Sequence, residues 1–280
     1  MEFGLHGVGH EYWADDGIQR RAEWYNLIDR EPWPEESLQQ HIQDFREIMA
    51  RELVDEIKGN SAKGKTTRAI IPCGPACWYK SFTDLVNSEY ISLKKLVVFH
   101  MDECLDWQGQ ELPRKHPYSF RGFMEENFYN PILHELSIPS ENRNWLNGSN
   151  IQEIKKCIEQ APVDITYGGW GQDGHIAYNQ ARRNPFSHIT LEDVRNSTVR
   201  IQENNPDTVI ALAQRTFGSA YKFVPPMSVT LGIKECLSAK KVRLFSDTGA
   251  WKQTARIVLY SFLYHRGNKL CNRYRHYEKC

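Results

Sequence analysis

The sequence has no excess of charge of either sign. It contains 35 Lys and Arg residues and 35 Asp and Glu residues, so its formal net charge is zero. That balance argues against a nucleic-acid-binding surface and against an anionic membrane as partner, because both need a strongly basic face. An anionic small molecule is still compatible with it, since one or two local cations are enough to bind one.

The sequence also lacks long apolar runs, and its first residues do not resemble a secretory leader. No stretch approaches the roughly 20 apolar residues that a membrane-spanning helix needs. The first residues, MEFGLHGVGHEYWADD, are polar and acidic and show neither the basic nor the apolar region of a signal peptide. We therefore expect a cytoplasmic protein that contacts no membrane.

The seven cysteines form no recognisable framework. Their number is odd, and they are scattered from Cys73 to Cys280 in a chain too long to depend on disulfides. Cys73 and Cys77 have no second Cys or His pair at metal-binding spacing. We expect thiols here and no zinc site.

What the sequence does contain is an alternation of apolar strands and amphipathic helices. Because the 280 residues show no repeat and no low-complexity linker, we expect a single domain over residues 1–280, with 1–32 as an N-terminal extension. The alternation predicts an α/β fold with a mostly parallel sheet. Strands are expected at Thr66–Pro72, Lys94–His100, Val163–Gly169 and Lys240–Ser246, and a strand or the entry to a helix at Met227–Ile233. Helices are expected after Pro34 (with Ser37 and Gln40 as a capping box, and ending before a loop at Gly59–Lys65), at Cys77–Val86, at Ser119–Tyr129 with Phe120, Phe123, Met124 and Phe128 inward, at Ile151–Gln160, around Arg215, and at Ala250–Leu263.

The residues that follow the predicted strands are the first place to look for a site. In open α/β sheets, ligands bind outside the carboxyl ends of the strands. Four stretches stand there: CGPAC (Cys73–Cys77), MDE (Met101–Glu103), GGWGQDGH (Gly168–His175) and SDTGAWK (Ser246–Lys252). They hold most of the reactive side chains of the chain.

Two of these stretches carry candidate proton-transfer groups. A carboxylate at a strand end, Asp102 or Glu103, is partly desolvated and well oriented to act as a base, or else it caps the next turn or helix. In Gly168–His175, four glycines permit positive φ and a close approach of backbone amides to a ligand. Asp173 can support the charge of His175, which can carry a proton near neutral pH; the alternative is a tight turn with a satisfied histidine.

Two cations are candidate anchors for a phosphate. Lys252 opens a predicted helix, where the helix N-terminus adds a favourable field for an anion, and Arg215 lies in another predicted helix. Taken alone, each is better interpreted as an exposed basic residue on a solvated face.

Four segments then point to a known family. VVFHMDE, HPYSFRGFMEENFY, NWLNGSN and GGWGQDGHIAYNQ occur in this order. In order and spacing they resemble the glucosamine-6-phosphate deaminase (isomerase) family, which is related to the 6-phosphogluconolactonases. The resemblance covers roughly Arg68 to Lys252, about two thirds of the chain. It implies a three-layer sandwich around a mostly parallel, Rossmann-like sheet. It also implies an isomerase/deaminase of the hydrolase class, which converts an amino-sugar phosphate to fructose-6-phosphate and ammonia without metal or organic cofactor.

The resemblance also assigns roles to residues. Asp102 is the expected base that moves a proton between C2 and C1 through an enediol-type intermediate. His175, with Asp173 beside it, is expected to open the pyranose ring by proton transfer at O5. Gln180 stands where the family has a glutamate of the same ring-opening set. The expected substrate and phosphate contacts are Gly74, Gly169, Gly171, Arg215 and Lys252.

Two departures from the family pattern leave the reaction open. Gln180 carries no charge and cannot raise the proton affinity of an imidazole as a carboxylate does. The family's phosphate loop, Thr-Gly-Gly-Thr-Pro, is replaced by Cys73–Cys77, in which Pro75 lacks an N–H donor and Ala76 a hydroxyl. Three hypotheses follow: the family reaction, isomerisation or lactone hydrolysis of another sugar phosphate, or sugar-phosphate binding without catalysis. Because relatives form assemblies, a homo-oligomer is left open as well.

Overall fold

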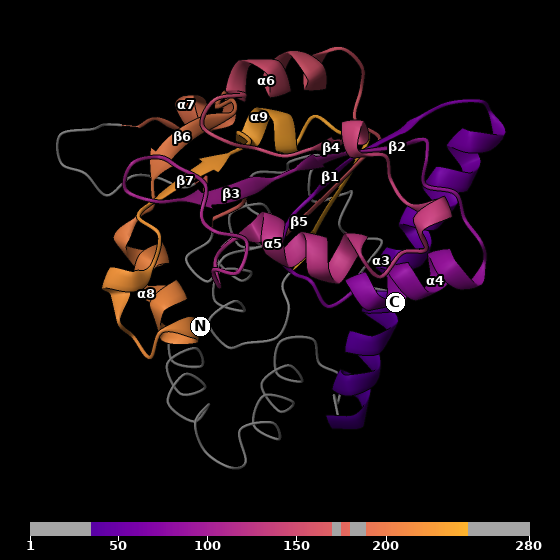
Figure 1. The fold of residues 1–280 in the computed structure, drawn as a ribbon, viewed down its shortest axis with the longest axis horizontal. Coiled ribbons are helices and arrows are strands. Elements are labelled where there is room, and N and C mark those ends of the chain that lie inside the picture. The colour runs from indigo at the N-terminus through magenta and orange to yellow at the C-terminus, as the bar shows by residue number, and fades with distance from the viewer. Residues whose placement is uncertain (1–34, 170–174, 180–188, 246–280) are drawn as a thin grey trace.

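A five-stranded parallel sheet forms the centre of the protein (Figure 1). The computed structural model describes residues 35–169, 175–179 and 189–245, and gives the backbone alone for 35–45, Arg215 and Phe245. The strand order is β4-β2-β1-β5-β8. The strands are β1 (Thr67–Ile71), β2 (Leu96–His100), β4 (Arg143–Asn144), β5 (Ile165–Gly169) and β8 (Lys241–Phe245). This sheet confirms the predicted mostly parallel α/β fold.

Helices cover both faces of this sheet (Figure 1). Successive side chains of β1 point to opposite faces, so Ala69 and Ile71 join one core and Ile70 joins the other. The first face carries α3 (Glu35–Ala62), α4 (Tyr79–Ser88), α5 (Phe120–Met124) and the π-helix η1 (Glu125–Tyr129). The second face carries α6 (Ile151–Glu159) and α9 (Ile233–Cys236). The expected three-layer sandwich is therefore confirmed.

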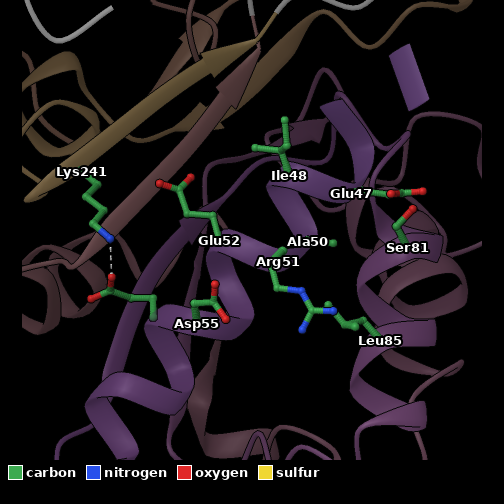
Figure 2. A pocket seen from close by; sticks show the side chains of 10 residues that line it. Glu47, Ile48, Ala50, Arg51, Glu52, Asp55, Ser81, Leu85 and Lys241 are labelled. Atoms are coloured by element: carbon green, nitrogen blue, oxygen red, sulfur yellow. Dashed lines mark hydrogen bonds and ion pairs between the residues drawn. The ribbon is translucent and has the colours of Figure 1, made fainter. Parts of the chain in front are cut away.

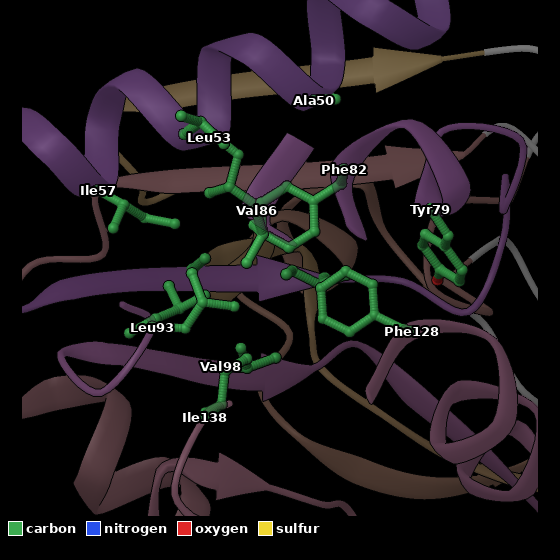
Figure 3. Close-up of a cluster of buried hydrophobic side chains, with 14 of the residues drawn as sticks. Ala50, Leu53, Ile57, Tyr79, Phe82, Val86, Leu93, Val98, Phe128 and Ile138 are labelled. Atoms are coloured by element: carbon green, nitrogen blue, oxygen red, sulfur yellow. The ribbon is translucent and has the colours of Figure 1, made fainter. Parts of the chain in front are cut away.

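The core beneath α3 and α4 is built from aliphatic and aromatic side chains (Figure 3). Phe82 of α4 stacks on Phe128 of η1, with ring centroids 5.3 Å apart and ring planes 3° from parallel. Leu53 of α3 and Val86 of α4 close over the same cluster. Burial of this much apolar surface fixes both helices on the sheet, and so fixes the loop that joins β1 to α4.

A second, antiparallel sheet lies on the other face and was not predicted. It has the order β3-β7-β6, with β3 (Asp102–Leu105), β7 (Met227–Thr230) and β6 (Arg200–Glu203). Met101 joins the two sheets: its N–H donates to the carbonyl of Ile71 at 3.2 Å, and its carbonyl accepts from the N–H of Leu231 at 2.9 Å. Met101–Glu103 is therefore no loop after β2, because Asp102 already begins a new strand.

The remaining elements are short, apart from α8. They are α7 (Leu191–Arg195), α8 (Pro206–Thr216), η2 (His134–Leu136), η3 (Ser140–Asn142) and η4 (Tyr221–Phe223). Met227–Ile233 contains both expected alternatives in succession, since β7 ends at Thr230 and α9 begins at Ile233.

Among the described residues, no helix has the length and apolar character needed to cross a membrane. The expected helix Ala250–Leu263 and extension 1–32 lie outside the described residues.

Three local predictions were wrong. Ser37 lies inside α3 and cannot head a capping box, because the helix has already begun at Glu35. The same helix runs on to Ala62, so the expected loop at Gly59–Lys65 starts later. Phe123 is 39% exposed rather than inward. The buried pair is Met124 and Phe128, and one residue corresponds to about 100° of helix rotation, which carries Phe123 off that face.

Candidate active site

The order in which the chain adds strands to the parallel sheet changes direction between β1 and β5. The chain runs from β1 through β2 to β4 on one side, then crosses to β5 and β8 on the other. In open α/β sheets, such a change of strand order marks the carboxyl edge as the place where ligands bind. Cys73–Cys77 follows β1, and His175 comes after β5. The site is therefore expected at the carboxyl edge of the parallel sheet.

Asp102 lies at this same edge because Met101 alone separates it from the end of β2. Its side chain is half-buried. Burial, and then repulsion by the neighbouring Glu103 carboxylate, raises the pKa of Asp102 to about 8. Such a carboxylate is a far stronger base than an ordinary aspartate, although only a minor fraction of the group is ionised at pH 7. These properties suit a group that removes a proton from carbon.

Glu103 points to the opposite side of β3 and caps a helix. Its carboxylate accepts backbone N–H groups of Cys104 at 2.9 Å, Phe120 at 2.8 Å and Arg121 at 2.7 Å, the last two in the first turn of α5. Burial raises the pKa of Glu103 to about 7, although these hydrogen bonds lower it. Of the two roles considered for the acidic pair, Asp102 therefore fits the base and Glu103 fits the cap.

Glu103→Ala is expected to lower the free energy of unfolding by about 2–4 kcal/mol, because it leaves buried backbone donors without an acceptor. Urea denaturation measures this loss. Glu126→Ala, at an exposed position of η1, is the matched control and should change stability little. A Glu103→Ala protein as stable as that control would contradict the capping role.

A strained turn carries the residues that follow His175. Ala177 and Tyr178 have positive φ angles of 49° and 53°, which cost energy in residues other than glycine. Asn179 compensates, because its side-chain amide donates to the carbonyls of Ile176 at 3.0 Å, Ala177 at 3.0 Å and Leu231 at 2.7 Å. Left-handed backbone is thus present in the turn after His175, at two residues that are not glycines.

Gly168 and Gly169 are needed for close packing. They end β5, and neither has a positive φ, so that expectation is wrong for them. A Cβ on Gly169 would lie 2.8 Å from the carbonyl oxygen of Gly74 and 2.9 Å from Cδ of Pro75. The missing side chain therefore lets the loop after β1 close onto the end of β5, and it brings Gly74 and Gly169 together as predicted site neighbours.

Tyr178 interacts with both candidate proton-transfer residues: its ring stacks with His175, and its hydroxyl is affected by the charge of Asp102. The imidazole of His175 stacks on the Tyr178 ring, with centroids 5.2 Å apart and planes 6° from parallel. The Tyr178 hydroxyl pairs with Sγ of Cys104 at 3.3 Å. Burial, Cys104 and then the Asp102 charge raise the pKa of Tyr178. Burial and then the same Asp102 charge raise the pKa of Cys73, which holds that side chain as a neutral thiol in the site.

Several predicted residues cannot be placed in this arrangement. Asp173, Gly171, Gln180 and Lys252 lie outside the described residues. Arg215 lies in α8, where its backbone alone is described. Conversely, Tyr178 and Cys104 were not predicted as site residues from the sequence. The aromatic residue three positions after the candidate histidine is the signal that could have identified Tyr178.

A separate groove of about 770 Å³ lies between α3 and α4 (Figure 2). Asp55, Arg51 and Leu85 are among its lining residues, and Lys241 closes one side through its ion pair with Glu56 at 2.7 Å. Lys241 is the first residue of β8, so the groove is at the amino end of that strand, away from Asp102. Within the described ranges, no group of three or more His, Cys, Asp or Glu side chains could hold a metal ion.

Comparison with known proteins identifies the family. The chain is 31% identical over 227 residues to a glucosamine-6-phosphate deaminase of Caenorhabditis elegans, which covers 78% of this chain and 77% of that relative. It is 33% identical over 213 residues to the glucosamine-6-phosphate deaminase of Pectobacterium carotovorum, which covers 72% of each chain. The chain belongs to the glucosamine-6-phosphate deaminase family. No protein-family model matches it.

Solved structures agree with this family at the level of the fold. A structure of a monomeric glucosamine-6-phosphate deaminase superposes with a TM-score of 0.62 at 20% identity, over 78% of this chain and 84% of that one. A 6-phosphogluconolactonase from Leishmania guyanensis gives 0.52 at 14% identity, over 75% and 81% of the two chains. The fold of the deaminase family is therefore shared with lactonases, and the expected resemblance is confirmed.

Proposed function

We propose that the protein converts glucosamine-6-phosphate to fructose-6-phosphate and ammonia. The observation that carries the proposal is Asp102, a half-buried carboxyl group of raised pKa at the carboxyl edge of the sheet, next to the reversal of strand order. Membership of the deaminase family supports the choice of substrate. Both proposed reactants are water-soluble sugar phosphates, which is consistent with the proposed cytoplasmic location.

Ring opening comes first in this proposal. The imidazole of His175 delivers a proton to O5 as the C1–O5 bond breaks, while the O1 hydroxyl gives up its proton, which yields the open-chain aldehyde. Asp173 and Gln180 are proposed to support the imidazole. Because Gln180 has no charge, its proposed support of the imidazole is a hydrogen bond alone.

Proton transfer between carbons follows. The Asp102 carboxylate removes the proton from C2, the electron pair forms the C1–C2 double bond, and the C1 carbonyl oxygen takes up a proton from water, which gives an enolamine. The protonated carboxyl then returns the proton to C1, which leaves an imine at C2. Water adds to this imine and ammonia leaves, so that C2 becomes the ketone. One water is consumed and one ammonia is released, so the proposed net reaction combines isomerisation with hydrolysis of a carbon–nitrogen bond.

Anchoring of the phosphate is proposed for Arg215 and Lys252, together with the backbone near Gly74 and the glycines Gly169 and Gly171. Binding energy at the phosphate orients the reacting carbons over Asp102. The loop Cys73–Cys77 offers fewer donors than a loop with hydroxyls, because Pro75 has no N–H. This loop is the feature that favours the second candidate, a reaction on another sugar phosphate.

A product assay separates the candidates. Purified protein is incubated with glucosamine-6-phosphate, with glucosamine, or with 6-phosphogluconolactone, and ammonia, ketose phosphate and acid release are measured. The proposal predicts ammonia and ketose phosphate in equal amounts from glucosamine-6-phosphate and far less from glucosamine. Acid release from the lactone without ammonia from the amino sugar would support the second candidate and overturn the first.

A further inference from the structure

We propose that Tyr178 is a positioning residue for the proposed reaction: its ring fixes the imidazole of His175 in the orientation needed for ring opening. This role rests on the proposed function. It concerns a residue that the assigned chemistry leaves unused, since the hydroxyl of Tyr178 is engaged with Cys104 and the side chain is 5% exposed.

The ring of Tyr178 stacks with two other rings. His175 stacks on it at 5.2 Å and 6°, and Phe120 stacks on it at 6.2 Å and 22°. The hydroxyl of Tyr178 contacts Sγ of Cys104 at 3.3 Å, which restrains rotation of the ring within its plane. Aromatic contacts of this kind favour a defined ring geometry as well as burial. The imidazole therefore stacks on a ring that has further contacts of its own, with Phe120 and Cys104.

The backbone of Tyr178 is held just as firmly, and by the sheet that carries the base. The Tyr178 carbonyl accepts the side-chain amide of Gln202 from β6, and the Ala177 carbonyl accepts the hydroxyl of Thr230 from β7. Thr230 is the residue paired with Asp102 in the β3–β7 register. One antiparallel sheet thus connects Asp102 to the turn that presents Tyr178, at the cost of two consecutive positive φ angles.

This connection has a functional consequence. The two proton-transfer groups must face one substrate, and a displacement of about 1 Å can cost about 100-fold in rate. A side chain without a ring at position 178 removes the surface that limits rotation of the His175 imidazole. The chemical step should then slow while binding of the sugar phosphate changes little.

Three variants test the role. Tyr178→Phe keeps the ring and removes the contact with Cys104, whereas Tyr178→Leu removes the ring. Tyr118→Leu is the matched control, because Tyr118 belongs to the same buried cluster but its ring meets His116 and Phe217, at tilted angles. If Tyr178→Leu fails to fold, Tyr178→Met replaces it, because its unbranched side chain can fill the space without a ring.

Two readouts are combined: steady-state kinetics, and proton NMR of the His175 ring, assigned with His175→Gln. We expect kcat to fall about 10- to 100-fold in Tyr178→Leu with KM within about 3-fold, and Tyr178→Phe and Tyr118→Leu to stay within about 3-fold of wild type. The His175 ring signals should show contacts to the Tyr178 ring in wild type, and they should shift in Tyr178→Leu but not in Tyr118→Leu.

Several results would overturn the positioning role. Tyr178→Leu could turn over as fast as Tyr118→Leu, Tyr178→Phe could lose as much activity as Tyr178→Leu, or wild-type His175 could show no ring contact with Tyr178. An inactive wild type would instead overturn the proposed function. The NMR comparison decides the positioning role in that case as well, because it needs no turnover.

Discussion

Asp102→Asn is expected to lower kcat/KM for ammonia release from glucosamine-6-phosphate by about 10²–10⁴-fold, the usual contribution of a positioned general base. Asparagine keeps the size and one oxygen of the side chain but cannot accept the proton from C2. The loss should fall mainly on kcat, because the sugar phosphate is bound by other groups. Steady-state measurement of ammonia and ketose phosphate gives both parameters.

Asp84→Asn is the control for this substitution. Asp84 lies in α4, its side chain is 61% exposed, and it pairs with Lys80 one helical turn away. The same chemical change there should leave turnover unaltered. A folded Asp102→Asn protein that retains the activity of the Asp84→Asn protein would show that the proton is removed by another group.

The same substitution is expected to stabilise the protein at alkaline pH. The pKa of Asp102 is raised from an ordinary 3.8 to about 8, mainly by burial. Between these values the folded protein keeps the carboxyl protonated while the unfolded chain ionises, so the wild type loses stability as pH rises from about 4 to about 8. Asparagine does not ionise and escapes this loss.

We expect Asp102→Asn to exceed wild type by about 2–5 kcal/mol at pH values above 8, and by little near pH 4. Urea denaturation of both proteins at each pH measures the difference. A variant that is less stable than wild type in alkaline solution would mean that ionised Asp102 is stabilised in the fold, contrary to the desolvation described here. Loss of activity together with gain of stability is the usual behaviour of a strained catalytic group.

The parallel sheet was predictable from the sequence because each strand is a short apolar run bounded by loop residues. β1, β2, β5 and β8 coincide with expected strands to within two residues at either end. The antiparallel strand β3 was not predictable in this way. It begins at Asp102, one residue after β2 ends, and its register is set by β7, more than a hundred residues later. Pairing over such a separation leaves no local pattern.

In the site, too, residues recognisable from the local sequence could be predicted, whereas roles that depend on contacts distant in sequence could not. Asp102 and His175 stand out by residue type and by their position after strands. The capping role of Glu103 depends on backbone groups of Phe120 and Arg121, which only the tertiary fold brings near. Gly169 was misinterpreted for a related reason: the close approach of Gly74, and not local backbone strain, explains why no side chain is present at Gly169.

The first measurement to make is exchange of the C1 protons of fructose-6-phosphate with solvent deuterium, followed by proton NMR in the presence of ammonium. It reports carbon–hydrogen bond breaking without depending on release of a product. If Asp102 moves the proton between C2 and C1, wild type exchanges one C1 proton and Asp102→Asn does so at least about 100-fold more slowly. Equal exchange rates in the two proteins would contradict the assignment of Asp102 as the base.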